Sequence, residues 1–413
     1  MGNWQVVDGG ITAPKGYRAA GIVAGLKASG AMDLALVVSD VDAIASGVFT
    51  TSQVKAACVT YCLDRLDEKT SARAILCNSG QANACTGEQG MQDVKTSVEQ
   101  MGQSLGISPD LVLVASTGVI GQRIKMQELS AGIPAVVSAL STDGGADAAA
   151  AICTTDLVPK FIALETQVDG RPVRIGGMAK GSGMIHPNMA TMLGFITCDA
   201  AISSQLWQDM LQAAVNKSFN QITVDGDTST NDTVIALANG ESRTPAITQP
   251  GKAADELEAM LTEVCTYLAK AIARDGEGAT CLIEVQVTGT TTDRDAQLIA
   301  RTIAGSSLVK SAVFGRDPNW GRIAAAAGRA GITFESDDMD ICLGPFKLIQ
   351  NGQPLDYDAN AASAYLKAAA EGEYLKEDTV LIQVNVGPGP GAGTAWGCDL
   401  SYDYVKINAE YTT

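Results

Sequence analysis

The sequence predicts a mixed α/β fold, and two recurring patterns of apolar residues predict it. Short apolar runs of the kind that form covered β-strands are interspersed with longer stretches whose apolar residues recur every three or four positions, as on one face of a helix. The chain has 413 residues, 46% hydrophobic and only 18% charged. It can therefore bury a large core, in two domains or in one elaborate domain.

Five apolar runs are expected to be strands. They cover residues 34–39, 74–77, 111–115, 282–287 and 380–386. The last two alternate apolar and polar residues more clearly, which is typical of a strand with one exposed face.

Six stretches are expected to be helices. They cover residues 90–105, 127–140, 203–219, 253–274, 295–313 and 360–370. Ser203 and Asp295 stand just before residues with helical periodicity and are expected to be N-caps, because their side chains can accept a hydrogen bond from the first turn. Pro134 lies inside the second stretch, where it removes one backbone hydrogen bond.

The composition argues against two classes of partner. The net charge is −17, and so acidic a surface disfavours phosphate backbones and anionic membranes, so neither nucleic acid nor a membrane is expected. No apolar run approaches the roughly 20 residues that span a bilayer, and the first residues do not resemble a signal peptide. The ten cysteines are scattered without a C-x-x-C pair, which is typical of small buried side chains in a reducing cytoplasm.

His186 is the single histidine of the chain. A metal site built from several histidines is therefore disfavoured, and no metal is expected. Only one histidine is also available as the base of a Ser-His-Asp or Cys-His arrangement. A nucleophile in this chain is expected to be activated by another group.

Four glycine-rich polar segments follow expected strands or helices, where backbone N–H groups can face a ligand. They are residues 77–87, 115–121, 176–187 and 274–278. The segment 387–397 is also glycine-rich, but it matches neither G-x-G-x-x-G nor the P-loop pattern. It is expected to be a loop with unusual backbone angles rather than a phosphate cradle.

Thr191 has two interpretations. It precedes an apolar run, and most threonines in that position are β-branched residues at the start of a strand. If the Ala190–Thr191 bond were cut, however, Thr191 would carry its own base, because a free α-amino group has a pKa of about 7.7–8.0. The Thr191 hydroxyl could cut this bond by attacking the Ala190 carbonyl to give an ester that water then opens, and the glycine-rich approach permits the necessary bend. On the residues alone, the strand interpretation stays ahead.

Seven segments spread over most of the chain carry a resemblance to a known family. They are STGVIG at 116–121, TTD at 154–156, KGSGMIHPNMATMLGFIT at 180–197, SFNQITVDGDTSTNDT at 218–233, ARDGEGAT at 273–280, VFGRDPNWGRI at 313–323 and TAWGCDLSYDYVKINAEY at 394–411. In the same order they resemble segments of the ornithine acetyltransferases, also called glutamate N-acetyltransferases. The run at 180–197 resembles that family's self-cleaving segment.

The resemblance implies an α/β fold with two sheets between helical layers, a four-layer αββα sandwich. It also implies cleavage between Ala190 and Thr191 into an alpha chain, residues 1–190, and a beta chain, residues 191–413, two of each forming a heterotetramer. Thr191 would be the nucleophile, and Thr117 and Gly118 would stabilise the oxyanion. The residues matching substrate-binding positions are Thr154, Lys180, Thr191, Glu277, Asn408 and Thr413.

The implied reaction moves an acetyl group from N2-acetyl-L-ornithine to L-glutamate through an acetyl-threonine intermediate, in the cyclic route of arginine biosynthesis. No bound cofactor is needed, and acetyl-CoA is open as a second acetyl donor. Two other functions stay open: a self-cleaving aminopeptidase or amidase that hands the acyl group to water, and an uncut protein that only binds a small molecule.

The sequence departs from the family pattern in two places. Cys198 stands where relatives often carry threonine, and the loop at 387–393 looks longer than usual. His186 is retained in the family-like run and is expected to have a turn or structural role, with no part in catalysis.

Overall fold

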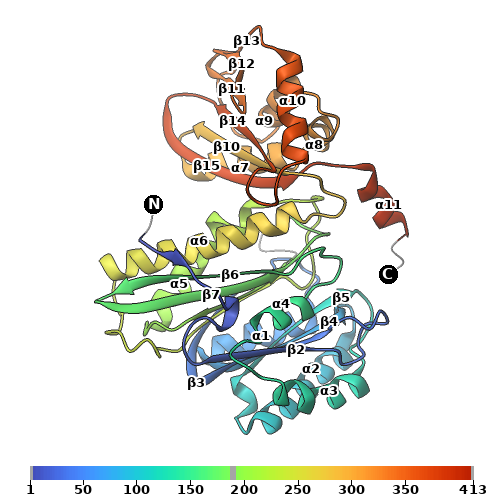
Figure 1. Ribbon diagram of the computed structural model, residues 1–413, viewed down its shortest axis with the longest axis vertical. Coiled ribbons are helices and arrows are strands. Elements are labelled where there is room, and N and C mark those ends of the chain that lie inside the picture. Colours follow the sequence, from blue (N-terminus) through green and yellow to red (C-terminus); the bar gives the residue numbers. More distant parts are fainter. Residues whose placement is uncertain (1–2, 187–191, 411–413) are drawn as a thin grey trace.

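The computed structural model describes residues 3–186 and 192–410. It is a mixed α/β fold, as the sequence predicts, and its strands form two β-sheets (Figure 1). All five expected strands are present, as parts of β3, β4, β5, β10 and β14.

In the described part of the chain, the larger sheet has nine strands in the order β1-β6-β7-β8-β9-β3-β4-β5, with β2 paired to β3. Its strands are β1 (Gln5–Val6), β2 (Tyr17–Ile22), β3 (Leu34–Phe49), β4 (Ser71–Gln81), β5 (Val112–Val119), β6 (Lys160–Val168), β7 (Arg171–Lys180), β8 (Leu193–Cys198) and β9 (Thr233–Ala238).

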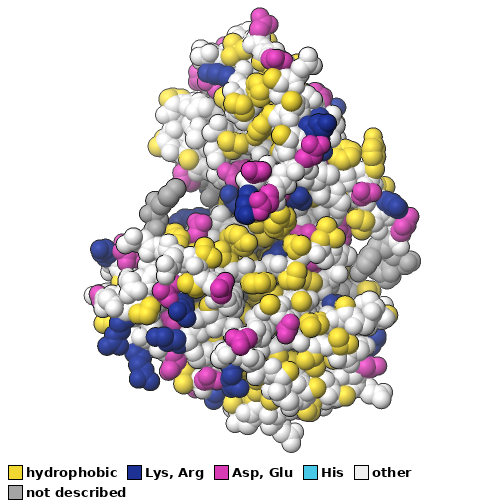
Figure 2. All heavy atoms as spheres, in the orientation of Figure 1, with side chains coloured by type: hydrophobic (Ala, Val, Ile, Leu, Met, Phe, Trp, Pro, Cys, Tyr) yellow, Lys and Arg dark blue, Asp and Glu magenta, His cyan; other side chains and the backbone are white. Residues whose placement is uncertain are grey.

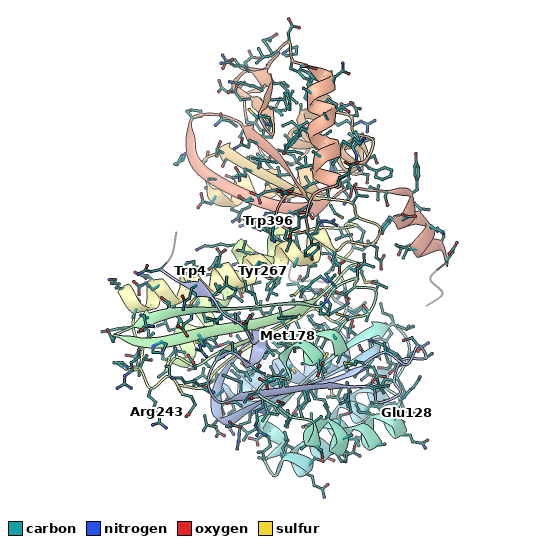
Figure 3. All side chains as sticks on the ribbon, viewed as in Figure 1. Trp4, Glu128, Met178, Arg243, Tyr267 and Trp396 are labelled. Atoms are coloured by element: carbon teal, nitrogen blue, oxygen red, sulfur yellow. The ribbon has the colours of Figure 1, made fainter. Side chains whose placement is uncertain are left out.

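The long strand β3 joins two halves of this sheet. Its first part pairs with β2 and β4, and its second part pairs with β9, with a register irregularity between Val38 and Ala43. The two halves face each other, because Phe195 and Leu237 of β8 and β9 lie in the same buried cluster as Leu36 of β3. Met178 of β7 also belongs to this cluster and is labelled in Figure 3.

Helices cover the outer faces of the two halves. Helices α1 (Ala57–Glu68), α2 (Gly87–Leu105) and α3 (Met126–Ser138) contribute to the cluster around β3–β5. Helices α5 (Ser204–Lys217) and α6 (Lys252–Arg274) form a second cluster with the opposite side of β7–β9. The order through this part of the molecule is therefore helix, sheet, sheet, helix (Figure 1). The cleavage of this body into two intertwined chains stays a prediction.

The smaller sheet has six strands in the order β13-β12-β11-β14-β10-β15. They are β10 (Leu282–Gly289), β11 (Asp340–Leu343), β12 (Phe346–Gln350), β13 (Gln353–Pro354), β14 (Thr379–Asn385) and β15 (Gly389–Cys398). Helix α6 lies between the two sheets and contacts β6 and β7 on one side and β15 and β10 on the other (Figure 1). Trp396 of β15 is buried with α6 at this junction, as Figure 3 shows.

The helices confirm most of the expected helical stretches. The described α-helices are α1 (Ala57–Glu68), α2 (Gly87–Leu105), α3 (Met126–Ser138), α4 (Gly145–Ala151), α5 (Ser204–Lys217), α6 (Lys252–Arg274), α7 (Asp293–Ala304), α8 (Ser307–Phe314), α9 (Trp320–Gly328), α10 (Ala359–Ala370) and α11 (Tyr402–Glu410). Pro134 lies inside α3, and Ser203 is the N-cap of α5 as expected, although its side chain accepts no capping bond.

The helix expected over residues 295–313 is wrong in two respects. The structure breaks it into α7 and α8, because the Ser306 hydroxyl accepts a hydrogen bond from the Val309 N–H and begins a new helix. The N-cap of α7 is Thr292, not Asp295, and the Thr292 hydroxyl accepts from the Asp295 N–H at 3.2 Å.

The glycine-rich segment 387–397 is not simply a loop. From Gly389 onward it forms β15, which pairs antiparallel with β10 at the edge of the smaller sheet. Its glycines allow α7 to approach closely: a Cβ on Gly393 would lie 2.4 Å from the Gln297 nitrogen. Close helix–strand packing therefore explains a composition that the sequence pattern assigns to a loop.

The surface and the cysteines follow the composition. Acidic side chains are spread over the whole face drawn in Figure 2. Seven cysteines are buried and two are partly buried, as expected, but Cys85 is exposed. In residues 3–186 and 192–410, no helix has the length and apolar character needed to cross a membrane.

Candidate active site

A cavity of about 290 Å³ gathers most of the residues that the sequence singles out. Its lining consists of Ala82, Thr117, Gly118, Ile120, Thr154, Thr155, Lys180, Gly183, Met184, Ser229, Thr230, Asn231, Glu277 and Asn408. Both proposed oxyanion residues and four proposed substrate-binding residues are in this set. Ala190, Thr191 and Thr413 lie outside the described residues.

The lining comes from segments far apart in the chain. Thr117 and Gly118 lie near the end of β5, and Lys180 is the last residue of β7. Glu277 lies between α6 and β10, and Asn408 lies on the C-terminal helix α11, which stands apart from the body in Figure 1. The site is thus assembled by the tertiary fold, at the ends of strands rather than in their middle.

Gly118 is required at its position by two observations. Its φ is +134°, in the region that L side chains rarely adopt, and a Cβ there would lie 2.2 Å from the carbonyl carbon of Gly80. Strand β4 therefore leaves no room for a side chain at this position of β5, beside the cavity.

A buried chain of charges lies behind Lys180. The Asp156 carboxylate accepts hydrogen bonds from Lys160 Nζ at 2.7 Å and from the Gly181 N–H at 2.7 Å, and Lys180 Nζ is 4.0 Å from its other oxygen. Lys160 Nζ also contacts Asp275 at 2.6 Å. Two buried carboxylates and two lysines therefore balance each other next to the cavity.

The two buried carboxyls of this chain differ in acidity. Burial opposes the ionisation of Asp156, but the lysines Lys180 and Lys160 outweigh it and hold the pKa of Asp156 well below its usual range. Burial raises the pKa of Asp275, and the nearby Lys160 only partly offsets this effect. Asp156 is consequently the permanent anion behind Lys180.

Glu277 is held in place by hydrogen bonds to Ser182 and Asn408. Its N–H donates to the Ser182 carbonyl at 3.1 Å, and the Ser182 hydroxyl donates to the Asp275 carbonyl at 2.6 Å. The Asn408 amide donates to Glu277 Oε2 at 2.8 Å. The cavity thus presents a cation, Lys180, and an anion, Glu277, an arrangement that suits a molecule carrying both a carboxylate and an ammonium group.

His186 lies outside the cavity lining. Its Nδ1 is 2.9 Å from the Thr223 hydroxyl, and burial, followed by the nearby Arg301, lowers its pKa. Its contacts agree with the structural role expected from the sequence.

The structure adds residues that the sequence did not single out. Asp156 and Lys160 support Lys180 from behind, and Asn231 joins three walls of the cavity. Asp156 lies in TTD and Asn231 lies in SFNQITVDGDTSTNDT, two of the segments that carry the family resemblance. Their roles depend on contacts that no spacing along the chain reveals.

The chain is similar to known proteins over its whole length. It is 72% identical over 414 residues to a Nostoc protein called arginine biosynthesis bifunctional protein ArgJ 1, with all of both chains covered. It is 58% identical to a Populus trichocarpa protein called arginine biosynthesis bifunctional protein ArgJ, chloroplastic, covering 100% of this chain and 86% of that protein.

A solved structure agrees with these relatives. A crystal structure of arginine biosynthesis bifunctional protein ArgJ from Bacillus halodurans is 46% identical, with a TM-score of 0.50, and the match covers 52% of this chain and 98% of that chain. The ArgJ family model matches residues 18–413. The chain therefore belongs to the ArgJ family.

Proposed function

We propose that this protein is an acetyltransferase that moves the acetyl group of N2-acetyl-L-ornithine to L-glutamate. The observation that carries this proposal is the cavity itself, where Thr117, Gly118, Thr154, Lys180 and Glu277 meet from distant parts of the chain. Membership of the ArgJ family and the names of its relatives, which refer to arginine biosynthesis, agree with this reaction.

Substrate binding follows from the two charges of the lining. Lys180 would pair with the α-carboxylate of acetylornithine or glutamate, and Glu277 would accept the side-chain ammonium group of ornithine. Asp156 lies behind Lys180, and its side chain is fully buried. The Lys180 ammonium is thereby flanked by a fixed anion on one side and by the cavity on the other.

The proposed chemistry takes two acyl transfers. Thr191 Oγ attacks the acetyl carbon, the free Thr191 amine takes the hydroxyl proton, and the negative oxygen of the tetrahedral intermediate is stabilised at Thr117 and Gly118. The bond from the acetyl carbon to the α-nitrogen of ornithine then breaks, and that nitrogen takes the proton. The amine of glutamate attacks the acetyl-threonine ester and regenerates the Thr191 hydroxyl.

Self-cleavage between Ala190 and Thr191 is part of the same proposal. It would give an alpha chain of residues 1–190 and a beta chain of residues 191–413, which we propose assemble as a heterotetramer of two of each. Support comes from the Bacillus halodurans structure, where 98% of the solved chain corresponds to only 52% of this chain. A solved chain of about half length is what a cut protein provides.

The proposed enzyme works without a metal or bound cofactor, and acetyl-CoA is a candidate second donor of the acetyl group. Its location in the cytoplasm also stays a prediction. Acetylation of glutamate with acetyl-CoA as sole donor, followed by product analysis, decides whether the chain performs the second reaction.

The test of the main reaction compares acetyl transfer with hydrolysis. Purified protein is incubated with acetylornithine, with and without glutamate, and ornithine and N-acetylglutamate are quantified. The proposal expects ornithine release that depends on glutamate, whereas equal release with water alone would identify an amidase. T191A should lower the rate by a factor on the order of 10⁴ or more, and T191S, which keeps a hydroxyl, should retain part of it.

A further inference from the structure

Asn231 links three segments beside the cavity by hydrogen bonds. It is 5% exposed, and its Nδ2 donates to the Ala82 carbonyl at 2.6 Å and to the Ser116 carbonyl at 2.8 Å. Its Oδ1 accepts from the Thr230 hydroxyl at 2.5 Å. Ala82 and Thr230 line the cavity, and Ser116 precedes the oxyanion residues Thr117 and Gly118.

The Ser116 carbonyl shows which edge of β5 faces the cavity. Within residues 3–186 and 192–410, β5 is the last strand of its sheet: one edge pairs with β4, and the other edge has no partner strand. Along an extended strand, the N–H and C=O groups of alternate residues point to the same edge. The Val119 carbonyl accepts from the Ala82 N–H at 3.0 Å on the β4 side, whereas the Ser116 carbonyl points to Asn231.

This alternation gives the direction of the Gly118 N–H. Gly118 is two residues from Ser116, so its N–H shares the edge on which the Ser116 carbonyl meets Asn231. Gly118 itself lines the cavity, and its close approach to Gly80 fixes it from the opposite side. The Ser116 side chain is also held there, because its hydroxyl donates to Asn78 Oδ1 at 2.6 Å.

We propose that Asn231 is a positioning residue for the oxyanion site: its amide holds the Ser116 carbonyl and thereby aims the Gly118 N–H into the cavity. This inference rests on the proposed acetyl transfer, in which Gly118 stabilises the oxyanion. Asn231 also lines the cavity, but in this account it contacts no reacting atom and acts through the backbone of β5.

An amide is the side chain that this position requires. Two backbone carbonyls face Nδ2, so the group there must be a donor, and a hydroxyl faces Oδ1. A carboxylate has no proton to donate, and it would place a negative oxygen against two carbonyl oxygens. N231D keeps the shape of the side chain but replaces the donor by an acceptor. N231S introduces one hydroxyl donor, but its side chain is too short to reach both the Ala82 and the Ser116 carbonyls.

The predicted effect falls on turnover rather than on binding. Removing an oxyanion donor typically lowers kcat about 10²–10³-fold. Because the Gly118 N–H would be misaimed rather than lost, kcat of N231D and N231S should fall by a smaller factor, on the order of 10–100. The KM values for acetylornithine and glutamate should stay close to those of the parent enzyme, since Lys180 and Glu277 are untouched.

The experiment measures kcat and KM of parent, N231D and N231S, with the melting temperature of each. Q221E is the matched control, because Gln221 is also a buried amide, donates to the Asn216 carbonyl at 3.0 Å and lies outside the cavity lining. Q221E should lose stability without a selective loss of kcat.

The outcomes separate this inference from the proposed function. If the parent enzyme transfers no acetyl group, the proposed function fails before any variant is compared. If the parent is active and folded N231D or N231S keeps its kcat, or loses it only in step with a raised KM, the positioning role is wrong. Failure of both variants to fold, with Q221E folded, would assign Asn231 to stability and equally overturn the inference.

Discussion

Asp156 connects several parts of the site through its buried carboxylate. Its carboxylate is fully buried between Lys160 and Lys180 and accepts the Gly181 and Thr154 N–H groups. D156N would leave the buried Lys160 with Asp275 alone and would remove the anion behind Lys180. Breaking a buried pair from one side typically costs about 3–5 kcal/mol.

We expect D156N to lower the free energy of unfolding by roughly that amount and to raise KM for both amino-acid substrates. Denaturant unfolding and steady-state kinetics check these two effects. D110N is the matched control, because Asp110 also pairs with a lysine, Lys69, but on the surface. An equal loss of stability in both variants would contradict the role of burial.

The buried carboxyl of Asp232 leads to a prediction about how stability depends on pH. It is buried, its Oδ2 has no hydrogen-bond partner within the described part of the chain, and burial raises its pKa well above the usual range, only partly offset by the Met192 N–H and Lys180. A carboxyl whose pKa is raised on folding stabilises the fold fully below its unfolded pKa of about 3.9 and loses that contribution as pH rises towards the folded value. D232N has no such loss.

The free energy of unfolding of D232N, relative to the parent, should therefore rise between pH 4 and pH 7. D93N serves as the control, because Asp93 is also buried but both of its oxygens accept hydrogen bonds from the Arg123 guanidinium. Urea unfolding at several pH values measures both. A pH-independent difference between D232N and the parent would refute this account of Asp232.

At the residue scale, six residues that the family resemblance singles out meet in the structure, and their roles stay predictions. Thr117, Gly118, Thr154, Lys180, Glu277 and Asn408 all line one cavity. Asp156 and Asn231 were missed as individuals, because a carboxylate or an amide reveals its partner only in three dimensions. Thr191, Ala190 and Thr413 lie outside the described residues, so their roles stay predictions.

At the element scale, helix starts show what local sequence can and cannot predict. Asp295 looked like an N-cap, but Thr292 three residues earlier takes that role and Asp295 completes the first turn by accepting the Thr292 hydroxyl at 2.8 Å. The break before α8 was also missed, because Ser306 inside an apolar-periodic stretch carries no signal until its hydroxyl is seen to cap a new helix.

The cap of α7 yields a stability prediction. T292A should lower the free energy of unfolding by about 1 kcal/mol, since it removes the hydrogen bond to the Asp295 N–H. S203A is its natural control, because Ser203 is the N-cap of α5 but its side chain accepts no capping bond, so its loss should be smaller. Thermal unfolding of both variants tests this difference, and a larger effect at Ser203 would count against it.

At the scale of the whole molecule, the strand order could not be predicted from the sequence. Strand β9 pairs with both β8 and β3, although β3 lies far before it in the chain. Such long-range pairing depends on which buried faces fit together, and apolar runs of similar composition do not distinguish their partners. The resemblance to a family, rather than the pattern of the residues, supplied the layered architecture.

This strand order has a consequence for a chain cut at residue 190. Strand β7 would belong to the first fragment and β8 to the second, yet they pair along their length, and β3 pairs with β9 in the same way. Both fragments also share one buried cluster. The two fragments should therefore elute together from a sizing column and separate only in denaturant; separation under native conditions would contradict the fold.

The measurement that tests the central claim most directly is the intact mass of the denatured protein, before and after a brief exposure to acetylornithine. The account predicts two fragments, the second beginning Thr-Met-Leu-Gly. That second fragment should gain one acetyl group, which disappears when glutamate is added. An active protein that remains a single chain of 42.7 kDa, or an acetyl group found only on the first fragment, would contradict the account.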